Sequence, residues 1–553
     1  MYIRFSSVCA VAFAGQLAVS VALAQTPSPP PFGPAVEPGR ALALADLTNS
    51  NPLIPADIYR NASVSHADLA AFAWLEFISA VAPVAAGERG VPGGSFAASG
   101  GAQGGSQLPL LVWESYQHRT ELLPCSVSGG KALPPQTWGA SPTYVTTVLS
   151  SNPQECSTIA VSGTSSLPFN NLDEATQIAQ NILFYPATPG SPQPAGDAQV
   201  LFEAKVNQVE SDWVNQNYQS LIPKYGPFHF SPAITLPFGT VEVKAAWRPL
   251  SSIPQDQQNR YHTATVITYS GSDEKPTPEL QTYALIALHL IHKTPNYPAF
   301  IFATFEQVDD LANQLTGKPT GLYYVPTTYA SIAYTSPSST TFPPSGQTVL
   351  NPSINFNVTS PMAYPNGTAV PLPMGEVASI PDAVSLPSNN VAIPVTQPVA
   401  TTPEVAAVNS QALALMQQLP GFGPNFTWQY YKLTGVQALP TNDETSEDFY
   451  LANIVVESSQ PGIQLFRGFP PIKNGVLTNV RNQVNVIDYG ATPVAITSGG
   501  GCQGCHGIAQ TQNGFDFSFL FFGANGGGFS PDTLGLPSPA VAALRLIRRK
   551  YFQ

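Results

Sequence analysis

The sequence has few charged residues for its length. Only 10% of the 553 residues are Asp, Glu, Lys or Arg, and the formal net charge is −12. A surface so poor in positive charge does not attract nucleic acid or anionic lipid, so we expect no nucleic-acid partner. The 56 prolines and 43 glycines indicate instead that loops of uncharged polar residues make up much of the surface.

Long apolar runs are scarce as well, apart from one at the N-terminus. Arg4 gives a positive start, residues 8–22 are mostly apolar and small, and Ala22-Leu23-Ala24 fits a small-x-small cleavage pattern. This predicts a signal peptide over residues 1–24, cleaved near Ala24, and a periplasmic or secreted bacterial protein. A membrane anchor is the competing interpretation, but Gly15 and Gln16 interrupt the run. No later stretch of about 20 apolar residues is present, so we expect no integral membrane anchor.

Cysteine is rare too. The chain has five cysteines, and Cys9 is lost with the predicted signal peptide. Cys125 and Cys156 belong to no motif, and in an oxidising compartment such a leftover pair is most simply a disulfide. Closing a loop of about 30 residues stabilises a fold by roughly 3 to 4 kcal/mol on the chain-entropy model. We therefore expect a structural role for this pair.

The other two cysteines stand in the pentapeptide Cys502-Gln503-Gly504-Cys505-His506. This is the attachment spacing of a c-type haem, in which both thiols add to the vinyl groups and the histidine becomes the proximal iron ligand. A redox CxxC pair and half of a zinc site are the alternatives. The first needs a βαβ context and the second needs two more soft ligands nearby, and neither is visible. The sequence therefore predicts one covalent haem c held by Cys502, Cys505 and His506.

Methionine is nearly absent, which bears on the sixth iron ligand. A small class I cytochrome c carries its motif near the N-terminus and supplies a methionine from a later loop. Here no methionine follows His506, and the mature chain offers only Met362, Met374 and Met416, all upstream. We therefore do not expect the small class I cytochrome c fold, and the sixth ligand must come from the preceding chain, another side chain or water.

Our candidate for the distal ligand is His289, in the apolar run of residues 283–293 that also contains His292. On a helix, residues three apart share a face, so both imidazoles would reach one pocket. On a strand they point to opposite faces. Periodicity does not decide between these two structures, and a buried histidine in the core is the ordinary alternative.

The pattern along the chain predicts an α+β protein. Strands are expected at 200–206, 241–248, 261–269 and 300–305, and helices at 65–78 and 405–419. The expected organisation is a signal peptide (1–24), an extended proline-rich arm (25–60), a β-rich core domain with helices (61–333), a Pro/Ser/Thr-rich excursion or linker (334–402) and a haem-bearing C-terminal region (403–553).

Two stretches alternate at the period of a strand. In residues 241–248, apolar side chains alternate with Glu242, Lys244 and Arg248. Near the C-terminus a row of phenylalanines alternates with Asp516, Ser518 and Leu520; the row consists of Phe515, Phe517, Phe519 and Phe521. Such a row is typical of one packed strand face, and it also suits the wall of a porphyrin site.

Several blocks in order resemble a family of large, exported, single-haem bacterial proteins within the broad cytochrome c group. The resemblance covers most of the mature chain, and it implies one haem and a shared architecture but little about a substrate. The family often has a histidine and an asparagine where this chain has Gln307 and Asp310. The blocks are residues 73–77 with 112–114, 243–248, 288–289 with 293–294, 303–309, 451–453, and 502–510 with 516–519.

One haem without a recognisable catalytic constellation favours electron transfer with a redox partner protein or a small-molecule electron donor or acceptor. A peroxidase-like or oxidase-like haem enzyme with an open distal site is the alternative, because a relay does not need so large a chain. Glu306, Asp309 or Arg248 would then supply the distal acid or charge. A third hypothesis is a binding or structural module with haem as a fixed part.

Overall fold

A computed structural model describes residues 31–60, 64–101, 108–124, 133–148, 155–174, 200–221, 235–272, 275–308 and 402–438. It also describes several short strands and the single residues Cys502, His506, Asp516, Ser518 and Leu520. The predicted signal peptide and most of the predicted excursion over 334–402 lie outside the described residues.

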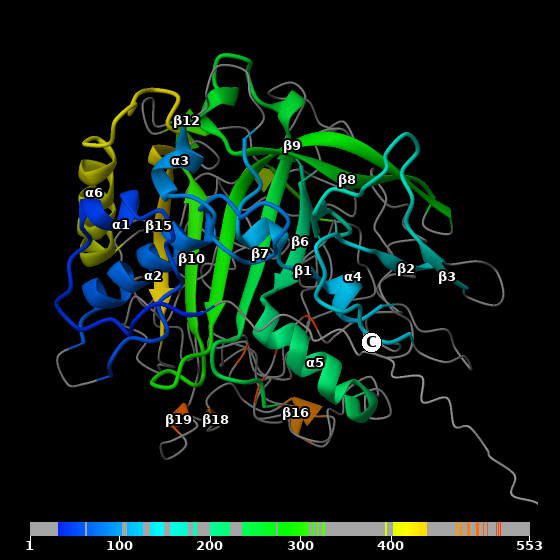
Figure 1. The fold of residues 1–553 in the computed structure, drawn as a ribbon, viewed down its shortest axis with the longest axis horizontal. Coiled ribbons are helices and arrows are strands. Elements are labelled where there is room, and N and C mark those ends of the chain that lie inside the picture. Colours follow the sequence, from blue (N-terminus) through cyan, green and yellow to red (C-terminus); the bar gives the residue numbers. More distant parts are fainter. Residues whose placement is uncertain are drawn as a thin grey trace, which may run out of the picture.

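An eight-stranded sheet forms the centre of the fold (Figure 1). Its main path is β1-β6-β7-β9-β10-β15, and all neighbours on this path are antiparallel. β8 pairs antiparallel with β9, and β4 pairs parallel with β8. The strands are β1 (Gln117–His118), β4 (Asn170–Asn171), β6 (Leu201–Val206), β7 (Val241–Pro249), β8 (Thr263–Ser272), β9 (Lys275–His292), β10 (Ile301–Gln307) and β15 (Tyr431–Gln437).

Strand β9 joins two parts of the sheet. It is 18 residues long. Its first half forms a hairpin with β8, and its second half lies between β7 and β10. The exposed first half and the buried second half match the change from polar to apolar residues near Tyr283.

Short ladders lie outside the main sheet. They are β2 (Val145–Val148) with β3 (Glu155–Thr158); β14 (Ile393–Pro394) with β13 (Tyr323–Pro326) and β5 (Asn181–Phe184); β11 (Ala312–Asn313) with β12 (Lys318–Pro319); β16 (Ile472–Lys473) with β17 (Val476–Leu477); and β18 (Val484–Val486) with β19 (Val494–Ile496).

Helix α2 begins where its sequence provides a cap. The Ser65 hydroxyl accepts from the Asp68 N–H, and the Asp68 carboxylate accepts from the Ser65 N–H, which satisfies two otherwise open donors. The helices are α1 (Leu44–Thr48), α2 (His66–Ala80), α3 (Phe96–Gly100), α4 (Arg119–Leu122), α5 (Gln208–Leu221) and α6 (Pro403–Met416), with 3-10 turns η1 (Trp113–Ser115), η4 (Leu250–Ser252), η5 (Gln258–Arg260) and η6 (Thr427–Tyr430).

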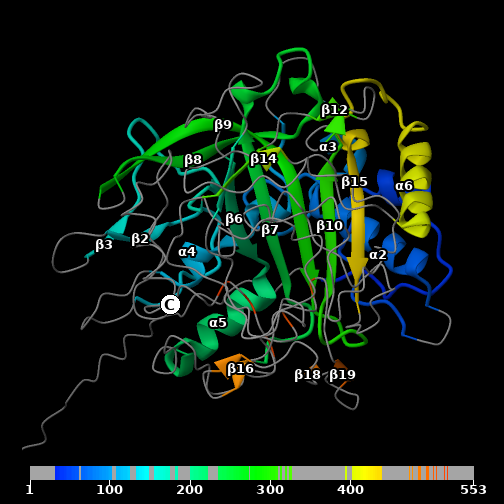
Figure 2. The same ribbon diagram turned by 180° about the vertical axis from the view of Figure 1, so that it is seen from behind.

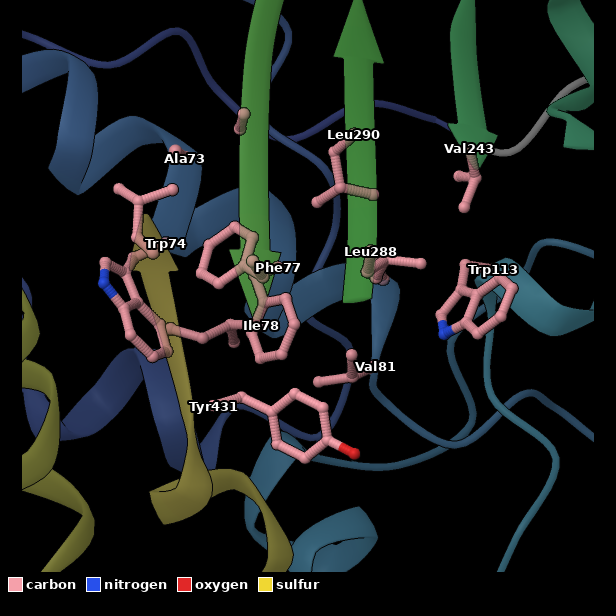
Figure 3. Packing of buried hydrophobic residues seen from close by; sticks show 14 of the residues in the cluster. Ala73, Trp74, Phe77, Ile78, Val81, Trp113, Val243, Leu288, Leu290 and Tyr431 are labelled. Carbon is pink, nitrogen blue, oxygen red and sulfur yellow. The ribbon is translucent and has the colours of Figure 1, made fainter. Parts of the chain in front are cut away.

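The main apolar core lies between α2 and one face of the sheet. Figures 1 and 2 show α2 on one side of β10 and β15, with α6 beside it. Trp74 and Phe77 of α2 pack on Phe305 of β10, and the Phe77 and Phe305 ring centroids are 4.2 Å apart. Figure 3 shows Leu288, Leu290 and other residues of this cluster. We call this side the apolar face.

The opposite side of the sheet carries polar side chains on its central strands, and we call it the polar face. The registers align Glu242 of β7 with Ile291 of β9, and Ile291 with Phe302 of β10. Two residues along the strands, Lys244, His289 and Thr304 form the next row. Side chains alternate along a strand, so these residues point away from α2. Glu242, His289 and Thr304 are nevertheless buried.

The α+β class predicted from the sequence is confirmed. The expected strands correspond to β6, β7, β8 and β10, and the expected helices to α2 and α6. Further along the chain, β15 joins the sheet next to β10, and α6 packs against α2 and β15. Among the described residues, no helix combines the length and apolar character needed to cross a membrane.

Candidate functional site

The two histidines of the 283–293 run lie on a strand, and so they point to opposite faces. His292 Nδ1 is 2.5 Å from Glu76 Oε1, and its ring stacks between Phe32 and Phe72 on the apolar face. His289 is buried on the polar face, in register with Lys244 and Thr304. Only His289 therefore remains a candidate for a site on that face.

His506 of the CxxCH motif lies against the same face. Its ring centroid is 4.7 Å from that of Phe302, and the side chain is buried. Phe302 is directly opposite Ile291, which makes His289 its diagonal neighbour. Diagonal neighbours on antiparallel strands are about 7 to 8 Å apart. His506 and His289 thus approach the same phenylalanine.

Cys502 is half-buried at the edge of a second apolar cluster on the polar face. This cluster contains Val206, Leu236, Phe302 and Leu520, with Ile291 packed against it. Cys505 lies outside the described residues. A thiol and an imidazole against an apolar, aromatic wall are the groups that a covalently held porphyrin requires, so the residues present fit a c-type haem.

The structure places some of the other residues predicted as a sixth iron ligand or as a distal acid or charge. Met416 is buried in the core of the apolar face, across the sheet from His506. Met362 and Met374 lie outside the described residues, as does Asp309. Arg248 bonds through its guanidinium to Ser252 at the end of β7. Glu306 is buried on the polar face, where it pairs in register with Ala287 and Lys432.

Three buried carboxyl groups lie beside the same apolar cluster: Glu210 of α5, Glu242 of β7 and Asp516. We call them the acid cluster. Asp516 Oδ2 accepts hydrogen bonds from Lys293 Nζ at 2.7 Å and from the Leu236 N–H at 2.6 Å. Glu242 is hydrogen-bonded to Ser518. Asp516 and Ser518 follow the CxxCH motif, so these bonds tie that part of the chain to the sheet.

Burial controls the ionisation of both glutamates. It raises the pKa of Glu242 to about 8, with the nearby Asp516 charge adding to the effect and Ser518 and Lys244 opposing it. The pKa of Glu210 lies well above its usual value, first because of burial and then because of the charges of Glu242 and Asp516. Burial also lowers the pKa of Lys293, and Asp516 opposes that change. The glutamates therefore favour the protonated form.

We expect Glu242 to make stability depend on pH. Its pKa rises on folding from 4.5 to about 8, so between these values the folded protein holds a proton that the unfolded chain has released. The contribution is complete below about 4.5 and is lost as the pH rises through about 8. The free energy of unfolding should fall by at most about 1.4 kcal/mol per pH unit in this window. Urea denaturation at several pH values measures it, and Glu242→Gln should flatten the profile; an unchanged profile would contradict the assignment.

Phe300, next to this region, has an unusual backbone conformation. Its φ is 71°, in the left-handed region that is an outlier for a bulky residue. The residue is buried in the cluster that Cys502 borders. Such strain costs about 1 to 3 kcal/mol and persists where the surrounding packing enforces it.

The core also holds buried polar pairs that the sequence did not indicate. Arg89 bonds to Glu121 at 2.8 Å, and His262 Nε2 is 3.0 Å from Glu114 Oε1. Burial opposes ionisation of Glu114, but His262 and the Leu111 N–H lower its pKa overall. Glu114 also accepts hydrogen bonds from the Leu111 N–H and from Asn170, and Glu121 from the Thr143 N–H, so both pairs have the partners of structural contacts.

Two further predictions concern the Cys125–Cys156 disulfide and the phenylalanine row near the C-terminus. Cys156 in β3 is disulfide-bonded. Its expected partner Cys125 lies outside the described residues, so the pairing remains a prediction. The phenylalanine row of residues 515–521 is also outside them, whereas the intervening Asp516, Ser518 and Leu520 are buried.

Comparisons with known proteins gave no assignment. No family model, no curated protein and no solved structure matches the chain. The resemblance to the single-haem family therefore remains a prediction, and the argument for function depends on the residues themselves.

Proposed function

We propose that the chain is an exported c-type cytochrome that binds one covalent haem through Cys502, Cys505 and His506 and transfers electrons. The observation that best supports this is the position of His506 and His289 around Phe302 on one buried face of the sheet. If both imidazoles bound the iron of the haem, the site would be closed, which favours a relay.

Each residue of the site has a defined part in this proposal. The thiols of Cys502 and Cys505 would hold the group through thioether bonds, and His506 would bind its iron. The bound haem supplies a one-electron centre. His289 would supply a second imidazole for the iron, and Phe302 and Leu520 would keep water away from the bound group. Exclusion of water and the choice of axial ligands set the reduction potential.

The absorption spectrum with and without carbon monoxide tests this function. The ferrous protein should be low-spin and should not bind the gas. His289→Ala should give high-spin iron that binds it, because one strong ligand is lost. His66→Ala serves as the control, since His66 contacts Val436 O near the other face of the sheet. Ready gas binding by the unchanged protein would contradict a closed site.

One observation favours the alternative of a haem enzyme with an open distal site. Glu306 is a buried carboxyl group on the same polar face, one row beyond His289 and Thr304. A buried acid near a haem is able to deliver a proton to a bound oxygen ligand. If the wild-type protein binds carbon monoxide, Glu306→Gln becomes the next variant to assay for peroxidase activity.

A further inference from the structure

The acid cluster has more negative groups than positive partners. Asp516 is matched by Lys293, with Nζ and Oδ2 2.7 Å apart. No hydrogen-bond partner for either carboxyl oxygen of Glu210 is found among the described residues, and Oε1 of Glu242 is likewise without one. Lys244 offsets only part of the cost of burying Glu242. Two adjacent buried carboxylates with so little compensating positive charge do not both stay ionised, so the pair binds protons instead.

The surroundings of the pair leave few groups to balance its charge. The residues opposite Glu242 on the neighbouring strands are Val206 of β6 and Ile291 of β9, both apolar. Glu210 faces it from α5, and Asp516, already paired with Lys293, faces it from the C-terminal segment. Lys244, two residues along β7, is the cation on its own strand.

We propose that the Glu210–Glu242 pair is a proton-binding site coupled to electron transfer at the His506 site. This inference rests on the proposed function. Reduction adds one electron from an external donor. At a pH near or above 8, where Glu242 is partly ionised, one proton from solvent then forms an O–H bond with its carboxylate. Oxidation breaks that bond and returns the proton, so the net charge of the buried region stays constant.

The register of the sheet makes this coupling physically reasonable. Glu242, Ile291 and Phe302 lie in one row across β7, β9 and β10, and His506 packs on Phe302. Two strand spacings separate Glu242 from Phe302, a distance of about 10 Å. A unit charge about 10 Å away, at an effective dielectric constant of about 20, changes the proton affinity of a carboxyl group about tenfold.

The test is the reduction potential of the full exported protein, measured by redox titration over a pH range centred on about 8, the pKa of Glu242. The potential should fall as the pH rises through this range, by about 59 mV in total, which is the change that a tenfold difference in proton affinity produces in a one-electron couple. Glu242→Gln and Glu210→Gln should each reduce the slope, because an amide resembles the protonated acid but does not titrate. Glu404→Gln, an exposed position in α6, should leave it unchanged.

Infrared difference spectroscopy of the oxidised and reduced protein provides the second readout. The C=O band of a protonated carboxyl group should change with redox state, and the change should be absent in Glu242→Gln or Glu210→Gln. A haem-containing protein whose potential does not depend on pH, or whose slope is the same in both variants, would overturn this inference alone. A protein without haem absorbance would overturn the proposed function and the inference together.

Discussion

Replacement of Cys502 and Cys505 together by alanine should remove all covalently bound haem from the exported protein. The two thioether bonds are the only covalent links that the CxxCH motif provides. Haem staining after denaturing electrophoresis measures the result directly, because a non-covalent haem is lost under these conditions. Single replacements should retain weaker staining through the one remaining thiol.

The matched control uses the other cysteine pair. Cys125→Ala with Cys156→Ala removes the predicted disulfide and should leave the haem stain intact. The control protein should be less stable by roughly 3 to 4 kcal/mol, the chain-entropy value for a loop of about 30 residues. Undiminished staining of the Cys502/Cys505 double variant would refute covalent attachment at the motif.

Lys293→Met should lower the free energy of unfolding by about 3 to 5 kcal/mol, the usual result when one partner of a buried ion pair is removed. The Lys293 and Asp516 side chains are 1% and 0% exposed, so the remaining Asp516 carboxylate has no access to water. Lys293 also donates to the Leu236 carbonyl at 2.8 Å. Chemical denaturation followed by circular dichroism measures the change.

Two further variants separate charge from packing. Lys293→Met combined with Asp516→Asn should recover part of the lost stability, because no uncompensated charge remains. Arg40→Met breaks the more exposed Arg40–Asp46 pair and should cost less than about 1 kcal/mol. Equal effects of Lys293→Met and Arg40→Met would show that the Lys293–Asp516 pair does not hold the C-terminal segment against the sheet.

Much of the fold was predictable because several segments carry strong local signals. Ser65 and Asp68 form the expected cap of α2. The alternation around Val243 and Glu242 marks β7, although a bulge between Ala246 and Trp247 shifts its register. In these segments the local sequence pattern agrees with the tertiary pairing, so the sequence alone is sufficient to predict the helix and the strand.

The run that contains His289 was not predictable in the same way. A short apolar run fits a buried strand as well as a buried helix, and only its pairing with β7 and β10 decides the matter. That pairing places the side chains of His289 and His292 on opposite faces of the sheet, because side chains alternate along a strand. The sequence made His289 a candidate ligand, and the pairing of the strands determines which face of the sheet its imidazole occupies.

The acid cluster had no local signal at all. Polar residues that alternate on a strand normally indicate a solvent-facing side, as the sequence of β7 does. Here Glu242 is buried beside Glu210 and against Asp516, a residue far along the chain. Contacts between residues so far apart in the chain do not change the local hydrophobic periodicity of the sequence. The ion pair of Asp516 with Lys293 was hidden for the same reason.

The most direct test of the central claim is the mass and absorbance of the intact protein, purified after export in cells with a working cytochrome c maturation system. The account predicts the mass of the mature chain plus one haem, together with a Soret band that persists after denaturation. A colourless protein with the mass of the mature chain alone would contradict it.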